Sequence, residues 1–281
     1  MSKGKGKYRF LLIRASAPSW RPKGLSKEEA LHGYGEIKHL LEDVEWDLHP
    51  GVMPTYGDWS IENREEFCHA AASRLPIVRE ACESGKYNAI MLLGGGQPGF
   101  LESREIARKY GIPVTGCAFS QMHIASMLGN KFTVIDFAES HNMYYYNLVV
   151  QLNFAQRCAS IRNLNYAHAR PGYTNEPSIN DEREKALRGE PSETIERAVN
   201  EVVSAIEEDG AEVITFGCSG TFWLQPFVQK RLDEMGWEIP VLEGYSCSIV
   251  LAKAMIDLGV DASGLTFPSD RPRQWRRKKT F

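Results

Sequence analysis

Two segments of the chain share one pattern: residues 88–100, NAIMLLGGGQPGF, and residues 212–223, EVITFGCSGTFW. Each is a short apolar run that ends in a glycine-rich turn, and an Ile-Pro-Val stretch follows after the next helical stretch. Aligning Gly96 with Gly220 places Gly94 opposite Cys218 and Gly95 opposite Ser219. Such self-similarity predicts two duplicated halves whose glycine turns face each other across a cleft.

Apolar runs and helical stretches alternate along the rest of the chain. We expect strands at residues 8–13, 44–48, 89–93, 112–115, 132–136, 212–216 and 239–242. We expect helices at residues 26–44 (opened by a Ser26–Glu29 capping box), 99–110, 120–128, 144–152 (capped by Ser140), 192–208, 222–235 and 246–258. We also expect a long helix that is capped by Asp58 and that Pro76 kinks or breaks. Residues 163–181 are polar and are predicted to form a surface excursion.

This alternation predicts an α/β fold with two pseudo-symmetric α/β domains, each a short parallel sheet flanked by helices. We expect the first domain to comprise residues 1–115 and 244–281, and the second to comprise residues 116–243. Ligands of such sheets bind beyond the carboxyl ends of the strands, so the active site is predicted in the cleft between the domains.

Composition limits the partners of the protein. The net charge of the 281 residues is −3, which gives no electrostatic reason to expect nucleic acid. No stretch approaches 18 apolar residues, so we expect no membrane partner. The six cysteines are scattered without a C-x-x-C pair, and the N-terminal apolar run is too short for a signal peptide. These features favour reduced thiols and a cytoplasmic location.

Cys218 is the strongest catalytic candidate. It follows a predicted buried strand and precedes a helix, where main-chain N–H groups and the helix dipole favour a thiolate. We therefore expect a depressed thiol pKa and a group that abstracts an acidic proton or attacks a carbonyl. Ser219, Gly220 and Thr221 are predicted to contact the substrate. The alternative interpretation is a buried packing cysteine.

The other glycine turn, Gly94-Gly95-Gly96-Gln97, is predicted to bind substrate oxygens through its N–H groups. It formally matches the dinucleotide pattern G-x-G-x-x-G. The next strand, residues 112–115, is however followed by Gly116 rather than by an acidic residue that would bind ribose. We therefore favour a small-molecule substrate with carboxylate or imide oxygens.

Four further residues follow predicted strands or begin helices. Asp136 and His141 are candidate catalytic groups, although a capping carboxylate and an ordinary helix-start histidine are the alternatives. Ser16 and Ser120 are candidate substrate-binding hydroxyls, with loop serines as the alternative. The histidines are spread along the chain without an H-x-x-x-H pair, so no metal site is expected.

At three places the chain resembles the aspartate/glutamate racemase superfamily, and within it the hydantoin racemase branch. These are residues 211–220, AEVITFGCSG, residues 96–100, GQPGF, and residues 157–162, RCASIR. The resemblance implies two α/β domains with the site between them. It also implies proton transfer by two cysteines, one from each half, without a metal or pyridoxal cofactor, and we expect a homo-oligomer.

The chain departs from this family pattern where the first cysteine is expected, because Gly94 stands there. The arylmalonate decarboxylase branch likewise keeps only the second cysteine, which protonates an enolate formed by loss of carbon dioxide. The family's asparagine after strand one is replaced near Ser16, and its threonine after the middle strand is replaced by Asp136.

Three functions stay open from the sequence. The first is a cofactor-independent isomerase or racemase acting at an acidic carbon of a hydantoin-like or amino-acid-derived small molecule. The second is a decarboxylase with Cys218 as its sole proton donor. The third is a non-catalytic small-molecule binding protein.

Overall fold

Two four-stranded parallel sheets form the centre of the computed structural model, which describes residues 6–19, 23–166, 168, 170, 172, 178–268 and 274. Sheet A has the order β2-β1-β3-β4, with β1 (Tyr8–Ile13), β2 (Val44–His49), β3 (Ala89–Leu92) and β4 (Val114–Gly116). Sheet B has the order β6-β5-β7-β8, with β5 (Phe132–Asp136), β6 (Cys158–Asn163), β7 (Val213–Phe216) and β8 (Val241–Leu242). The predicted α/β fold with two parallel sheets is confirmed.

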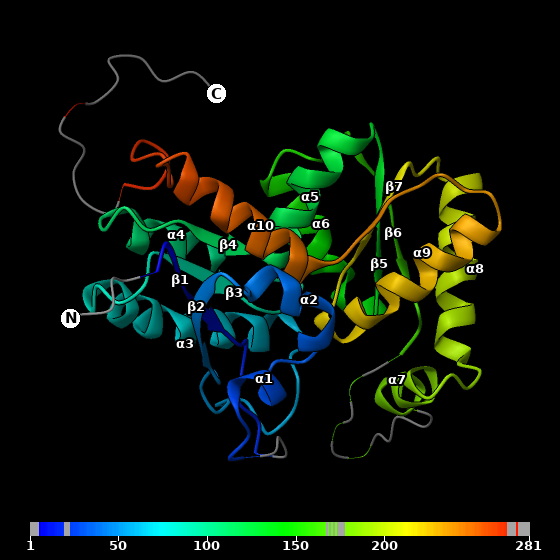
Figure 1. Cartoon of the computed structure of the whole chain (residues 1–281), viewed down its shortest axis with the longest axis horizontal. Helices are drawn as coiled ribbons and strands as arrows, with labels where there is room; N and C mark the ends of the chain where they lie inside the picture. The colour runs from blue at the N-terminus through cyan, green and yellow to red at the C-terminus, as the bar shows by residue number, and fades with distance from the viewer. Residues whose placement is uncertain are drawn as a thin grey trace.

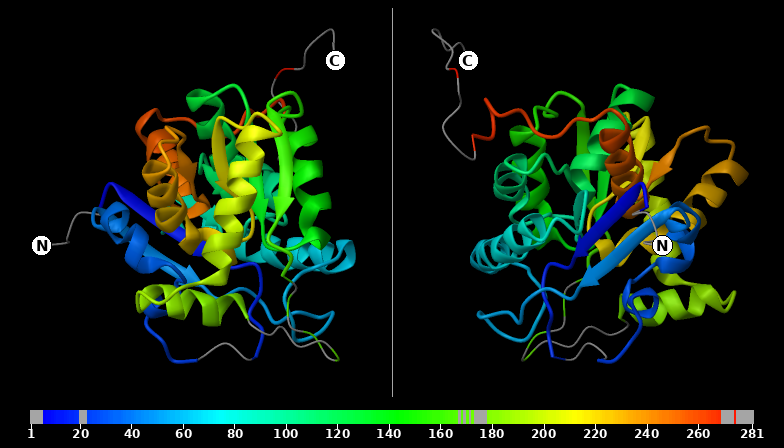
Figure 2. Two further views of the ribbon diagram at one scale, coloured as in Figure 1. Left: turned by 90° about the vertical axis from the view of Figure 1, so that its right-hand side faces the viewer. Right: turned by 60° about the vertical axis from the view of Figure 1, so that its left-hand side comes forward.

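Helices cover both sheets, as Figure 1 shows. They are α1 (Lys27–Ala30), α2 (Tyr34–Leu41), α3 (Arg64–Glu83), α4 (Phe100–Arg108), α5 (Cys117–Leu128), α6 (Asn142–Gln151), α7 (Ile179–Leu187), α8 (Glu193–Glu207), α9 (Gln225–Glu234) and α10 (Gly244–Asp257), with 3-10 turns η1 (Glu139–His141) and η2 (Ser219–Leu224). Helix α10 follows the last strand of sheet B but contacts helix α2 and two strands of sheet A, β3 and β4. It also packs on α5 where the two halves meet (Figures 1 and 2).

The two sheets have corresponding strand orders. Strands β1, β2, β3 and β4 occupy the positions in sheet A that β5, β6, β7 and β8 occupy in sheet B. Strand β3 carries the first glycine turn and β7 carries the second, so the sequence repeat coincides with equivalent strands. The exact domain boundaries and the homo-oligomer stay predictions.

Several local expectations were wrong. The helix expected over residues 26–44 is divided into α1 and α2, because Gly33 adopts a left-handed φ of 81° at the start of α2. The capping box of Ser26 and Glu29 is present. Helix α3 begins after Asn63, not at Asp58, and it continues past Pro76 to Glu83.

Further differences concern the second half. Ser140 makes no cap, since α6 begins directly from the η1 turn without a side-chain cap. Strand β6 and helix α7 were not predicted, and both lie in or beside the segment expected to be a surface excursion. The sequence also predicts an exposed basic stretch at residues 271–279, and this stretch lies outside the described residues apart from Gln274, which is exposed.

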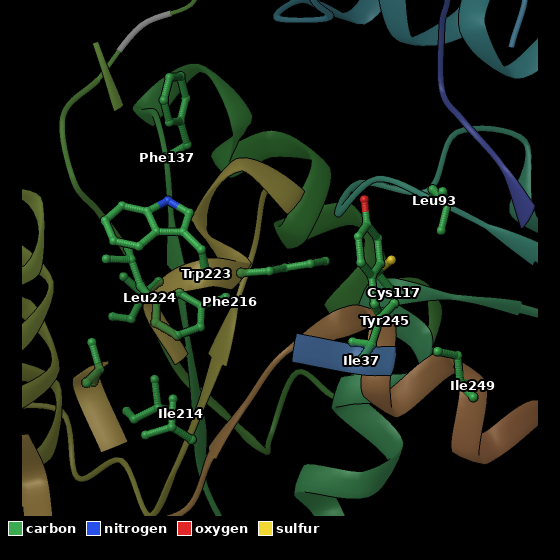
Figure 3. Packing of buried hydrophobic residues seen from close by; sticks show 14 of the residues in the cluster. Ile37, Leu93, Cys117, Phe137, Ile214, Phe216, Trp223, Leu224, Tyr245 and Ile249 are labelled. Carbon is green, nitrogen blue, oxygen red and sulfur yellow. The ribbon is translucent and has the colours of Figure 1, made fainter. Parts of the chain in front are cut away.

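One apolar core runs from sheet A to sheet B. Figure 3 shows Leu93, Cys117 and Tyr245 on one side of it and Phe216 and Trp223 on the other. All five side chains are almost completely buried, and burial of a large apolar side chain contributes about 1.5–3 kcal/mol. The core therefore joins the two halves while their strand ends stay apart to form a cavity.

Among the described helices, none has the length and apolar character needed to cross a membrane.

Candidate active site

A cavity of about 440 Å³ lies beyond the carboxyl ends of the central strands of both sheets. Its wall includes residues that directly follow four strands: Arg14, Ala15 and Ser16 after β1, Leu93 to Gly96 after β3, Phe137 after β5, and Cys218 to Gly220 after β7. Residues of α6 and of the loop before α3 complete much of the wall. The location agrees with the general rule that parallel sheets bind ligands at this edge.

Cys218 is held in place by contacts to its own main chain. Its N–H donates to the Asp136 carboxylate, and its carbonyl accepts a 2.6 Å hydrogen bond from the Thr221 hydroxyl. The Sγ atom accepts from the N–H of Gly220 at 3.5 Å, as the cap of η2. The Gln121 amide bonds both the N–H and the carbonyl of Phe216, two residues before the thiol. The sulfur is therefore fixed at the cavity wall.

The expectation of a depressed thiol pKa was wrong. Burial raises the pKa of Cys218 to about 12, and the negative charge of Asp136 adds to the increase. The N–H of Gly220 lowers the pKa, but this single donor does not offset desolvation and a nearby carboxylate. Cys218 is consequently a neutral thiol in the free protein, which suits it to donate a proton.

The first glycine turn faces the same cavity. Gly94 has a φ of 100°, and a Cβ atom built there would contact only the Cβ of Ala15, at 3.6 Å. Gly95 packs directly on the second turn, since its Cβ would lie 1.7 Å from the carbonyl oxygen of Gly217. The position that corresponds to Cys218 in the other half thus contains open space and no side chain.

Asp136 and His141 form a buried pair. The Nδ1 atom of His141 lies 2.9 Å from an Asp136 carboxylate oxygen, and Nε2 lies 3.2 Å from the carbonyl oxygen of Ile61. Both partners are acceptors, so the geometry favours the imidazolium with a proton on each nitrogen. Asp136 raises the pKa of His141 although burial opposes this. His141 lines the cavity, whereas Asp136 is fully buried behind the wall.

The remaining predicted residues divide into two groups. Ser16, Gly96, Ser219 and Gly220 line the cavity together with Cys218. Three others lie behind the wall: Gln97 accepts from the N–H of Phe119 at 3.0 Å, Thr221 bonds the carbonyl of Cys218, and the Ser120 hydroxyl is buried without a hydrogen-bond partner in the described part of the chain. The described residues contain no group of three or more His, Cys, Asp or Glu side chains that could hold a metal ion.

Sequence reasoning missed several wall residues. Tyr145 also lines the cavity. Burial raises its pKa well above the usual range, and the charge of Asp136 and a hydrogen bond to Asp136 add to the increase. His168 also lines the cavity, and burial followed by the charge of His141 lowers the pKa of His168 to about 3, so this imidazole is neutral. Arg14 directly follows a strand, and that signal was available in the sequence, as it was for Ser16.

Arg74 supports the cavity edge from behind. Its guanidinium is completely buried and, among the described residues, donates to four main-chain carbonyls: Ile13 at 3.1 Å, Arg14 at 3.2 Å, Pro98 at 3.1 Å, and Leu93. These carbonyls belong to the last residue of β1 and to the turns that follow β1 and β3. One side chain of α3 therefore fixes both turns of sheet A that face Cys218.

Comparison with known proteins agrees with this architecture. The family model "Asp/Glu/Hydantoin racemase" matches residues 51–252, which is more than half of the chain. The chain belongs to the Asp/Glu/hydantoin racemase family. It is 28% identical over 214 residues to a hydantoin racemase of Pseudomonas sp. (strain NS671), a match that covers 76% of each chain. The predicted membership of this family, and the prediction of an enzyme of the racemase type, are confirmed.

Several solved structures share the fold. An allantoin racemase from Klebsiella pneumoniae superimposes with a TM-score of 0.70 at 22% identity and covers 95% of both chains. A liganded double mutant of arylmalonate decarboxylase, with a glycine changed to cysteine and a cysteine changed to serine, superimposes with a TM-score of 0.58 at 12% identity over 89% of this chain and 92% of the other. Both likenesses concern the fold.

Proposed function

We propose that the protein is a cofactor-independent racemase that moves a proton at an acidic carbon of a hydantoin-like or amino-acid-derived small molecule, with Cys218 as one acid/base. One observation carries the proposal: the Cys218 thiol and the Gly94–Gly96 turn border the same cavity at the carboxyl ends of equivalent strands. A small planar enolate would fit between them. The name of the hydantoin racemase relative supports the substrate class.

Racemisation needs a second proton carrier, because no thiol stands at Gly94. We assign this role to His141, which lines the cavity and whose Nε2 would exchange its contact with the carbonyl oxygen of Ile61 for one with the substrate. In one direction neutral His141 removes the proton from the carbon and the Cys218 thiol supplies a proton to the other face. In the reverse direction the thiolate removes the proton and the imidazolium returns one. Asp136 orients both residues through one hydrogen bond to each of them.

This mechanism predicts a pH dependence. The reaction requires that one of the two proton carriers, Cys218 or His141, has its transferable proton and that the other has lost it. The pKa of His141 is raised above its ordinary value of about 6.5. The racemisation rate should therefore increase as the pH rises through the pKa of His141. A profile of kcat/KM against pH, for wild type and His141→Gln, would measure this directly.

A decarboxylase is the second candidate, and the raised pKa of Cys218 favours it. In that reaction a malonate-type substrate loses carbon dioxide, the electron pair of the broken bond forms an enolate, and the Cys218 thiol donates its proton to the carbon. Only a neutral thiol is needed, so the rate should not increase through the pKa of His141.

Incubation in deuterated water distinguishes the candidates. Candidate hydantoins and aryl- or amido-malonates are supplied, and NMR and gas analysis follow deuterium at the carbon, inversion, and carbon dioxide. Exchange with inversion and no carbon dioxide supports the racemase, whereas stoichiometric carbon dioxide release supports the decarboxylase. Cys218→Ala should lose at least a hundredfold in rate, and Cys68→Ala, at an exposed cysteine, should match wild type. Equal rates for Cys218→Ala and wild type would exclude both mechanisms, whereas binding without any turnover by wild type would favour a binding protein.

A further inference from the structure

Arg14 presents an unbalanced positive charge to the cavity. It is the first residue after β1, it lines the cavity, and it is half-buried. Its main chain is fixed, because its N–H donates to His49 at 3.1 Å and its carbonyl accepts from Arg74 at 3.2 Å. Within the described residues, its guanidinium has no ion pair and no hydrogen bond to another side chain. Burial lowers the pKa of Arg14, and the nearby Tyr245 hydroxyl is the group that opposes this.

The other charged groups of the described wall do not compensate Arg14. Glu29 is exposed at the rim, and its carboxylate is occupied by the N–H and the hydroxyl of Ser26, at 2.9 and 2.8 Å. The His141 imidazolium is balanced by Asp136 behind the wall. His168 is neutral. The β1 side of the cavity is therefore positive, and Arg74, which also lacks a carboxylate partner among the described residues, lies directly behind it.

A partly buried guanidinium loses hydration that only an anion or strong acceptors replace well. The planar fork of arginine fits a carboxylate with two parallel hydrogen bonds, and such charge-assisted bonds are roughly twice as strong as neutral ones. A neutral carbonyl or amide would use only part of this capacity. The cavity is thus better suited to an anionic ligand than to a neutral one.

We infer that Arg14 binds a carboxylate that the substrate carries away from the reacting carbon, so that the substrates are acidic hydantoins or acidic amino-acid derivatives. Arg14 adjoins Ala15, whose Cβ faces the open position at Gly94. The carboxylate would lie on this β1 side, with the reacting carbon between it and the Cys218 thiol. The inference rests on the proposed function for the reaction, but the anion site itself can be tested without turnover.

The test compares two ligands of the same shape, hydantoin-5-acetate and its neutral amide. Isothermal titration calorimetry is done with full-length Cys218→Ala protein, which binds without reacting. We expect the acid to bind at least tenfold more tightly than the amide. Adding Arg14→Gln should remove this preference, and Arg14→Lys should keep part of it. Lys38→Gln removes the same charge from an exposed site on α2 and should leave the preference unchanged.

Two results would overturn the anion site: equal affinity for acid and amide, or a preference that persists in folded Arg14→Gln protein, with folding checked by thermal unfolding. The proposed function fails in a different way. If the acid is preferred through Arg14 but no exchange occurs in deuterated water, the reaction is wrong and the anion site stands. If neutral hydantoins exchange as fast as acidic ones, the reaction stands and the assignment of Arg14 is wrong.

Discussion

A single buried carboxylate raises the pKa of both candidate proton carriers. Asp136 accepts from the N–H of Cys218 and from Nδ1 of His141. Its charge raises the pKa of the imidazole, and after burial it is the main cause that raises the pKa of the thiol. The two carriers are therefore coupled through a residue that does not itself reach the cavity.

Asp136→Asn should lower the pKa of Cys218, because it removes the negative charge and keeps an acceptor for the N–H. The rate of iodoacetamide labelling of Cys218 against pH, followed by mass spectrometry, measures this. Wild type should show an inflection above the value of about 8.5 for free cysteine, and the variant a lower inflection than wild type. Glu139→Gln, at an exposed neighbour of His141, is the control and should leave the profile unchanged. An identical profile for Asp136→Asn would contradict the coupling.

His141 should make stability depend on pH. Its folded pKa lies above the unfolded value of about 6.5, so its contribution is fully present below the unfolded pKa and is lost as the pH rises through the folded pKa. The free energy of unfolding of wild type relative to His141→Gln should therefore fall as the pH rises above about 6.5. Urea denaturation at several pH values gives this difference, and a difference that increases with pH would refute the protonated pair.

At the scale of elements, side-chain caps decide where the helices begin. Asn63 and Glu66 form a capping box at the start of α3, and Glu66 also accepts from Trp59 at 2.8 Å. Asp58, five residues earlier, instead accepts from the N–H of Ser19 at 2.6 Å. Both residue types cap helices well, so the sequence alone does not distinguish them.

Asn63→Ala should destabilise the protein by about 1 kcal/mol, the usual cost of losing a helix cap. Asp58→Ala should cost less than about 0.5 kcal/mol, because it removes only bonds to an exposed serine. Chemical denaturation of both variants compares them directly. The opposite order would mean that Asp58, not Asn63, stabilises the start of the helix.

The strands with continuous apolar sequence were the most predictable elements. Strands β1 and β5 have the predicted bounds, because Tyr8–Ile13 and Phe132–Asp136 are buried runs of the kind parallel sheets require. Strand β6 was missed, since it lies at an edge of sheet B, all its residues are half-buried, and its sequence CASIRN has no apolar run. An edge strand of this composition has no periodic signal.

The candidate site was predictable where residues follow strands. This signal gave Ser16, Gly94 to Gly96 and Cys218, which line the cavity. The same signal could not show that Asp136 lies behind the cavity wall, where its carboxylate accepts a hydrogen bond from the Cys218 N–H. Nor could it find Arg74, because an arginine in a helix is normally solvated and only the folded structure shows it buried.

For the whole molecule, the contact between the two glycine turns sets how closely the halves approach. A Cβ at Gly95 would lie 1.7 Å from the carbonyl oxygen and 2.4 Å from the carbonyl carbon of Gly217. Main-chain atoms cannot rotate away as side chains do. The cavity thus depends on the absence of a side chain at this position.

Gly95→Ala should destabilise the protein by about 2 kcal/mol or more and abolish turnover, because the turns must separate. Gly35→Ala is the matched control, since it lies in α2 with no atom within 4 Å of the added Cβ, and it should stabilise by about 0.5–1 kcal/mol. Thermal unfolding and activity of the two variants measure both effects. Wild-type stability and turnover in Gly95→Ala would show that the halves can shift apart freely.

The hydrogen bonds from Arg74 to main-chain carbonyl groups bear on when the active site forms during folding. Those of Arg14 and Pro98 lie in turns after β1 and β3, and the donor comes from a helix 60 and 24 residues away in the chain. Sheet A can pair its strands without this guanidinium, but its ligand-facing rim gains these bonds only when α3 docks. Hydrogen-bonded strands should thus precede an organised rim, so a newly made chain acquires its shape before it acquires competence to hold a substrate.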